Sequence, residues 1–248
     1  TIRYFTRMLE KHGVDVRLGT RADVKTLRGY DEVVLATGVE PRMPDIPGID
    51  HPMVLSYAEA IAGRPIGKSV AIVGAGGIGF DVGEFLTTDN SPTLNLKEWR
   101  AEWGALNPHE APQDVRGALT TPVPAPATRE VFLLQRTKGA QGRKLGKTTG
   151  WVHRASLRAK GVHQLSGVNY ERIDDRGLHI SFGSDHSESR LLEVDNVVIC
   201  AGQESVRDLE DGLLAHGITP RIIGGAEVAA ELDAKRAIRQ GTELAAQI

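Results

Sequence analysis

The chain is poor in cysteine: its 248 residues include one, Cys200. An internal disulfide and a Cys-x-x-Cys redox pair are therefore excluded, and so is iron–sulfur ligation within these residues. A flavoenzyme that passes electrons through an active dithiol would need that dithiol from a partner. We expect Cys200 to be a small buried hydrophobic residue at the end of a strand.

The chain also has no excess of charge of either sign and no long apolar run. The 30 Lys and Arg residues against 32 Asp and Glu residues give a net charge of −2. This balance gives no argument for a nucleic-acid or acidic-lipid partner. No apolar run reaches membrane-spanning length or opens the chain as a signal peptide would, so we expect a cytoplasmic location. The eight histidines show no metal-ligand spacing, and no nucleophile–base set is apparent.

The beginning of the chain already reads as the middle of a fold. Residues Thr1 to Lys11 predict a helix with one apolar face, and Val14 to Leu18 alternate as a strand does. Thr1 has no initiator methionine before it. We expect the chain to be a fragment of a longer protein.

Two segments of the chain are near-copies of each other. Asp31 to Gly38 reads DEVVLATG and Asp195 to Gly202 reads DNVVICAG. Each predicts a buried strand, apolar on both faces, that stops at small residues. They bracket a glycine-rich segment, Val70 to Gly79. One dinucleotide-binding domain inserted into another would produce this order.

The glycine-rich segment has the spacing Gly74-x-Gly76-x-x-Gly79 between a predicted strand, 69–73, and a predicted helix, 78–86. In such a turn the first glycine permits the bend, the second leaves room for a pyrophosphate, and the third lets helix and strand pack closely. The helix N-terminus then offers free N–H donors to the anion. The predicted contacts are Gly74, Ala75, Gly76, Gly77, Ile78 and Gly79.

The next strand of this unit, 130–135, ends in Gln135-Arg136 and carries no acid at its end. A carboxylate there would accept from the ribose of NAD. The loop 136–147 instead holds five basic residues, Arg136, Lys138, Arg143, Lys144 and Lys147. These groups suit an additional phosphate, so NADPH is favoured over NADH, with Arg136 and Lys138 as its contacts. The alternative is a solvated basic loop.

The remaining elements are predicted from periodicity and turn signals. We expect helices over 51–62, 97–103, 149–158 and 234–246, a linker over 41–47, and an irregular proline-rich insertion over 89–128. A hairpin at Asp174 to Gly177 predicts a small antiparallel meander before the second twin strand. Trp99 and Trp103 share a helix face and are expected to bury the insertion against the body, and His153 is expected to be structural.

Several stretches resemble one family, the bacterial flavoprotein 2,4-dienoyl-CoA reductases (NADPH). They are Gly74 to Asp81 (GAGGIGFD), Leu145 to Arg154 (LGKTTGWVHR), Val197 to Glu204 (VVICAGQE) and Glu231 to Ile238 (ELDAKRAI). The resemblance covers nearly the whole chain, and the Leu145 to Arg154 stretch is the most specific part.

This resemblance implies a Rossmann-like α/β fold, in which an NADPH domain with a parallel sheet and a meander is inserted into a partial FAD domain. Residues 1–65 and 196–248 would belong to the FAD domain and residues 66–195 to the NADPH domain. In that family electrons pass from NADPH to FAD, then through a [4Fe–4S] cluster to FMN in an N-terminal barrel. The barrel, its cluster cysteines and the first FAD glycine turn would precede Thr1.

The resemblance also implies flavin contacts, at Ala36, Thr37, Gly38, Gly202, Gly225, Ala226 and Glu227. Glu227 stands where relatives usually have an aspartate, and it is one methylene longer. The helix beginning near Ala234 would direct its N-terminus at the flavin pyrimidine.

The function predicted in this way is hydride transfer from NADPH to FAD, within the reduction of 2,4-dienoyl-CoA during fatty acid β-oxidation. No side-chain acid or base is needed for that step. Two alternatives stay open. One is a sister barrel flavoprotein of the enoate reductase or amine dehydrogenase type. The other is a nucleotide-binding module without turnover as an isolated chain.

Overall fold

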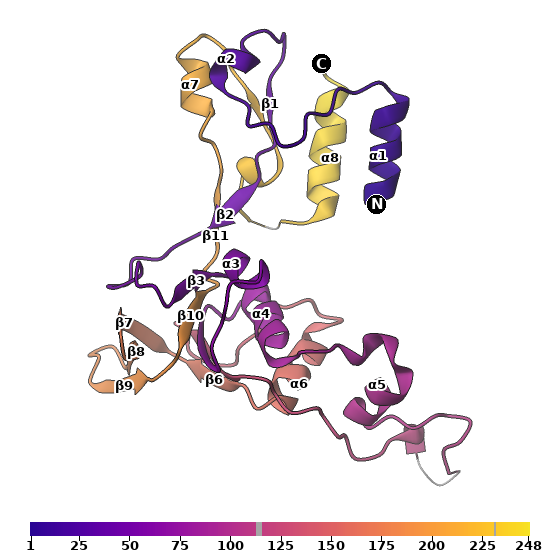
Figure 1. Cartoon of the computed structure of the whole chain (residues 1–248), viewed down its shortest axis with the longest axis vertical. Coiled ribbons are helices and arrows are strands. Elements are labelled where there is room, and N and C mark those ends of the chain that lie inside the picture. Colours follow the sequence, from indigo (N-terminus) through magenta and orange to yellow (C-terminus); the bar gives the residue numbers. More distant parts are fainter. Residues whose placement is uncertain (113–115, 231) are drawn as a thin grey trace. The chain divides into compact units, whose positions relative to one another are not determined.

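The computed structural model describes residues 1–112, 116–230 and 232–248. The chain divides into two compact units, coloured by sequence in Figure 1. Unit 1 comprises Thr1–Glu40 and Ser205–Ile248, and unit 2 comprises Pro41–Glu204. Unit 2 is therefore inserted into the sequence of unit 1, as the near-copied segments indicate. The expected functional boundaries near residues 65 and 195 lie inside unit 2 and stay a prediction.

A five-stranded parallel sheet forms the centre of unit 2. Its order is β3 (Val54–Ser56), β10 (Asn196–Ile199), β4 (Ser69–Val73), β5 (Glu130–Gln135) and β6 (His163–Ser166). Strand β10 is the second near-copied segment, and it lies beside β4 although it comes far later in the chain. Since all strands are parallel, their carboxyl ends meet at one edge of the sheet.

Both faces of this sheet are covered, which explains why its strands are apolar throughout. Val70, Ile72 and Leu133 pack against helices α3 (Tyr57–Ile61), α4 (Gly77–Thr87) and α6 (Gly150–Ala159). Ala71 and Val73 pack against the antiparallel meander of β7 (Val168–Asp174), β8 (Gly177–Phe182) and β9 (Glu188–Leu192). The predicted parallel sheet with a meander is confirmed (Figure 1).

The segment between α4 and β5 is the predicted irregular insertion. In its described residues, 88–112 and 116–129, the regular pieces are two 3-10 turns, η1 (Pro92–Leu94) and η2 (Arg116–Ala118), and one helix, α5 (Leu96–Trp103). Helix α5 begins at Asn95, whose side chain accepts from the backbone N–H of Glu98, and ends at Gly104 in the left-handed region. The predicted helix over 97–103 is thus confirmed.

Unit 1 is built from short elements around a small core. It holds α1 (Ile2–Lys11), α2 (Val24–Leu27), β1 (Val34–Leu35), α7 (Glu210–Leu214), β12 (Arg221–Ile222), η3 (Gly224–Ala226) and α8 (Ala234–Ala245). Strands β1 and β12 pair in parallel, and their core contains Val33, Leu35 and Leu213. The chain passes between the units through β2 (Val39–Pro41) and β11 (Gln203–Ser205), which pair with each other.

Three expectations for local structure are wrong. Val14 to Leu18 is not a strand, because no neighbouring strand in the described part of the chain pairs with it, and its Leu18 is 88% exposed. The expected strand over 31–37 is only β1, and Val34 is 39% exposed, so one of its faces is uncovered.

The expected helix over 51–62 begins only at Tyr57. The Ser56 hydroxyl accepts from the Glu59 backbone N–H at 3.2 Å, and the Glu59 carboxylate accepts from the Ser56 N–H at 2.9 Å. This capping box fixes the start of α3. The preceding Val54 and Leu55 therefore pair with β10 as strand β3.

Among the helices of the described chain, none is long and apolar enough to cross a membrane.

Candidate dinucleotide site

The glycine turn follows β4 at the carboxyl edge of the sheet. Gly74 has a φ of +114°, and a Cβ added to it would lie 2.3 Å from the carbonyl oxygen of Cys200. Both the backbone conformation and the contact with β10 therefore require glycine. Gly79 is constrained in another way, since its Cβ would lie 1.9 Å from the Gly74 carbonyl oxygen. This is the close helix–strand packing that the spacing predicts.

The two glycines in the middle of the turn face open space. A Cβ on Gly76 or Gly77 would have no atom within 4 Å in the described part of the chain. Ala75 and Ile78 lie between the constrained and the open positions and are half-buried. At these two positions the turn is thus a cradle that protein atoms do not fill.

Helix α4 begins in this cradle without a side-chain cap. Its N-cap is Gly76, which has no side chain to accept from the first turn. The first intrahelical bond runs from the Phe80 N–H to the Gly76 carbonyl at 3.1 Å, so the amides before Phe80 are not used within α4. Such amides and the positive end of the helix dipole together bind anions.

The end of β5 lies directly beside the turn. The Gly74 N–H donates to the Leu134 carbonyl at 3.0 Å, and β4 pairs with β5 in parallel up to Val73 and Leu134. Gln135, Arg136 and Lys138 therefore follow at the same edge, and the last two are exposed. The structure supports the assignment of β5 as the second strand of the nucleotide-binding unit.

The surroundings of Arg136 and Lys138 are defined on one side by the meander. Burial raises the pKa of Tyr170 on β7, and the nearby Arg136 charge opposes this rise. The stem of Lys138 lies over Gly167, where an added Cβ would be 3.1 Å from Lys138 Cγ. Arg136 and Lys138 thus lie near this sheet edge, beside the meander.

Sequence reasoning missed Gln141, which shapes the basic loop from within. Gln141 is buried, and its Nε2 donates to the carbonyls of Leu133 at 2.8 Å and Leu165 at 2.9 Å. Its Oε1 has no hydrogen-bond partner in the described residues. The sequence feature that could have pointed to Gln141 is its position as the one amide side chain in a basic, glycine-rich loop.

The expected flavin contacts fall into two groups. In unit 1 the structure brings Gly38, which follows β1, beside Gly225 of η3: a Cβ on Gly225 would lie 3.2 Å from Gly38 Cα. Ala36, Thr37 and Ala226 are adjacent to these glycines, and the Thr37 hydroxyl donates to the Val206 carbonyl. This close contact leaves little room for a side chain at Gly225. Both glycines are half-buried, whereas Ala226 is fully buried. Gly202 lies in unit 2, after β10.

The side chain of Glu227 is engaged by its own unit. Gln240 on α8 donates its Nε2 to the Glu227 carboxylate and accepts the Gly224 N–H at 2.7 Å through Oε1. Helix α8 is capped by Asp233, which accepts from the Arg236 N–H at 2.7 Å. A ribityl contact from Glu227 would have to compete with Gln240.

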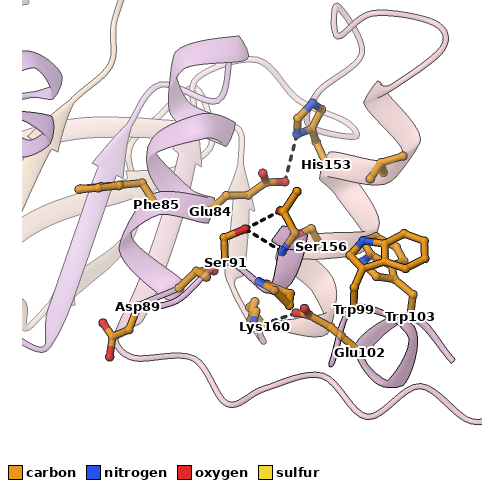
Figure 2. A pocket seen from close by; sticks show the side chains of 14 residues that line it. Glu84, Phe85, Asp89, Ser91, Trp99, Glu102, Trp103, His153, Ser156 and Lys160 are labelled. Carbon is orange, nitrogen blue, oxygen red and sulfur yellow. Dashed lines mark hydrogen bonds and ion pairs between the residues drawn. The ribbon is translucent and has the colours of Figure 1, made fainter. Parts of the chain in front are cut away.

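The insertion meets the body at a cavity of about 490 Å³, drawn in Figure 2. Trp99 and Trp103 project from α5, with ring centroids 6.4 Å apart. Lys160 Nζ lies 3.1 Å from the Glu102 carboxylate, and His153 Nδ1 lies 3.0 Å from Glu84 Oε1. His153 thus joins α6 to α4, a structural role. No residue of the glycine turn lines this cavity, so it is separate from the dinucleotide site.

Cys200 is buried at the end of β10, as expected. Burial raises the pKa of its thiol to about 12, so the thiol is inert at neutral pH. No cluster of three or more His, Cys, Asp or Glu side chains that could hold a metal ion occurs among the residues that the structure describes.

Three known proteins show which longer proteins the chain is similar to. A metal reductase of Desulforamulus reducens is 25% identical over 230 residues, 90% of this chain and 32% of that protein. The structure of 2-naphthoyl-CoA reductase with 2-naphthoyl-CoA has a TM-score of 0.73 at 21% identity, over 100% of this chain and 32% of that one. For the 6-hydroxypseudooxynicotine amine oxidase of Pseudomonas geniculata N1 the TM-score is 0.66 at 19% identity, over 92% and 31%.

The chain spans about a third of the length of these relatives. The two structures share its fold. The sequence pattern of the pyridine nucleotide-disulphide oxidoreductases, by contrast, matches residues 6–223. Since this match runs through most of both units, the chain belongs to the pyridine nucleotide-disulphide oxidoreductase family, with its FAD/NAD(P)-binding fold.

Proposed function

We propose that the chain is the FAD- and NADPH-binding part of a flavin oxidoreductase that reduces an unsaturated acyl-CoA. Residues 66–195 hold NADPH, and residues 1–65 and 196–248 hold part of FAD. When bound, NADPH supplies a hydride and FAD accepts it. The observation that carries the proposal is the cradle at Gly76 and Gly77, which is open beside an uncapped helix N-terminus.

The residues of this chain bind and orient the cofactors. The amides at the start of α4 donate to the pyrophosphate, and the close contacts at Gly74 and Gly79 fix the shape of the turn. Gly38 and Gly225 present backbone to the flavin. Gln141 keeps the basic loop attached to the ends of β5 and β6.

The preference for NADPH rests on the end of β5. Arg136 and Lys138 follow it where an NAD-binding protein would place a carboxylate. Arg136→Ala should weaken NADPH binding by about 1–3 kcal/mol through loss of a charge-assisted contact, and should leave NADH binding nearly unchanged. Calorimetric titration of both dinucleotides measures the difference.

A matched control for this variant is Arg176→Ala. Arg176 is an exposed arginine of the meander turn, paired with Glu193 at 3.6 Å. Removing it takes away the same charge at a distance from the glycine turn, and both affinities should stay at their original values. An equal loss of NADPH and NADH in the Arg136 variant would contradict the 2′-phosphate role.

The acyl-CoA substrate is the finer part of the proposal. Its support is the sequence resemblance to the dienoyl-CoA reductases, strongest at Leu145 to Arg154, together with a similar structure that is a 2-naphthoyl-CoA reductase by name. The same resemblance is the support for proposing a partner barrel that carries FMN and a [4Fe–4S] cluster. The amine oxidase among the similar structures favours the sister flavoprotein as a second candidate.

A third candidate is a nucleotide-binding module without turnover as an isolated chain. Mixing the purified chain with FAD and NADPH distinguishes this candidate from the two enzyme candidates. Bleaching of the flavin absorbance supports hydride transfer within this chain. A colourless chain that still binds NADPH supports the module.

A further inference from the structure

Arg42 lies at the same sheet edge as the glycine turn, and its backbone is fixed there. It follows Pro41 in the linker of unit 2, and its N–H donates to the Gly202 carbonyl at 3.1 Å. The side chain turns back over the end of β10, where Nε donates to the Ala201 carbonyl at 2.9 Å and Nη2 donates to the same oxygen. The guanidinium is therefore held in one orientation.

The residues that hold Arg42 also form the wall of the glycine turn. A Cβ on Gly74 would lie 2.3 Å from the Cys200 carbonyl oxygen and 3.2 Å from the Ala201 nitrogen. The Cys200 N–H in turn donates to the Val73 carbonyl at 2.8 Å. Arg42 thus bonds the residue next to the one that touches Gly74. A positive charge is placed beside the start of the phosphate cradle.

The charge of Arg42 has no neutralising partner in the described residues. It takes part in none of the ion pairs found there, and its side chain is exposed. A carbonyl oxygen orients a guanidinium but leaves its charge in place. Of the five N–H donors of the group, those not directed at Ala201 stay available.

We infer that Arg42 is a contact for the diphosphate of the bound dinucleotide, separate from the 2′-phosphate contacts Arg136 and Lys138. A guanidinium is the side chain best suited to a diphosphate, because it gives parallel N–H donors together with charge. The inference rests on the proposed function. Because NADPH and NADH share the diphosphate, the Arg42 contact should contribute equally to the binding of both and should not discriminate between them.

The test uses the full chain, with NADPH, NADH and adenosine 2′,5′-bisphosphate as probes in calorimetric titrations. The last probe carries the 2′-phosphate without a diphosphate. Arg42→Gln keeps a donor for the Ala201 carbonyl and removes the charge. It should weaken NADPH and NADH by the same factor, about tenfold, and leave the bisphosphate unchanged. Arg136→Ala should weaken NADPH and the bisphosphate and spare NADH.

Three outcomes count against the inference. Unchanged binding of both dinucleotides to the Arg42→Gln variant would overturn it, and so would an equal loss of all three probes. A wild-type chain that binds no dinucleotide would overturn the proposed function and this inference with it. Only the first two outcomes leave the proposed function standing.

The urea midpoint of the Arg42→Gln variant checks that it folds. Arg42→Lys is a second variant that tests the same contact. Lysine keeps the charge but loses the paired donors, so both dinucleotides should bind more weakly by about threefold. In addition, NADH binding by wild type should fall more steeply with salt than NADH binding by the Arg42→Gln variant, which lacks the charge. Equal salt slopes would contradict a phosphate contact.

Discussion

At the scale of single residues, the glycines of the turn divide into two kinds. Gly79 is required by the fold, because a Cβ would clash with the Gly74 carbonyl at 1.9 Å. Gly76 has a φ of −84° and nothing within 4 Å, so the fold tolerates a side chain there. The same residue type thus serves packing at one position and ligand access at the other.

This difference predicts opposite phenotypes for two alanine variants. Gly79→Ala should lower the free energy of unfolding by about 3 kcal/mol or more, since the clash is with backbone that has no room to shift. Gly76→Ala should unfold at the wild-type urea concentration but bind NADPH at least about tenfold more weakly. Urea titration and calorimetry test both. Wild-type binding by the Gly76 variant would place the pyrophosphate elsewhere.

Cys200 gives a second residue-scale prediction, because burial raises the pKa of its thiol from 9.0 to about 12. The native chain should react slowly with a thiol reagent at about pH 8, and the urea-unfolded chain should react at once. The unfolded thiol ionises from about pH 9 while the folded one resists, so the free energy of unfolding should fall as pH rises between these values. A Cys200→Ala variant without that fall is the control. Rapid labelling of native protein would contradict the burial.

At the scale of elements, a buried lysine links the insertion to the body of unit 2. Lys160, whose side chain is 4% exposed, contacts Glu102 of α5 and donates to the Ala125 carbonyl at 2.9 Å. It therefore joins two separate parts of the insertion to the end of α6. Trp99 and Trp103 lie beside this contact (Figure 2), so their fluorescence reports on it.

Lys160→Met should detach α5 from the body. It leaves the Glu102 carboxylate partly buried without a cation, and should lower the free energy of unfolding by about 2 kcal/mol. Tryptophan fluorescence during urea unfolding should show an early phase that wild type lacks. Lys97→Met, at an exposed position of α5, is the matched control and should behave as wild type. A single transition at the wild-type midpoint would show that the ion pair does not hold the insertion.

The elements also show what a sequence can predict. The turn at Gly74 to Gly79 and helix α4 follow from local glycine spacing, and the Asp174 to Gly177 hairpin from its turn residues. Strand β3 has only three residues, and the helix that follows it, α3, begins where the Ser56 cap fixes its start. Periodicity alone does not show this cap, so it predicted helix over the strand as well. Val14 to Leu18 alternates correctly but lacks a pairing strand in the described chain. Arg42 and Gln141 were missed because their partners, Ala201 and Leu165, are distant in sequence.

At the scale of the whole molecule, the two units differ in how much core they contain. Unit 2 packs a buried cluster on each face of its sheet. Unit 1 has a core of Val33, Leu35 and Leu213, and helices α1 and α8 contain no buried residue. Regions with few buried apolar contacts open at low free energy.

Hydrogen exchange followed by mass spectrometry should therefore separate the units. Amides of α1 and α8 should exchange well before those of β4, β5 and β10. Added NADPH should slow exchange in the peptides that cover β4, α4 and the end of β5, and leave α1 unchanged. Equal protection of both units by NADPH would contradict a dinucleotide site confined to unit 2.

The contact between Gly74 and Cys200 has a consequence for biosynthesis. A ribosome makes β4, the glycine turn and α4 early, but the wall that closes the turn arrives only with β10, more than a hundred residues later. Until β10 is made, the glycine turn lacks one of its walls, so the cofactor-binding site is incomplete. Cofactor rescue of a folding-impaired variant is thus expected to act only after release of this region from the exit tunnel, never during its synthesis.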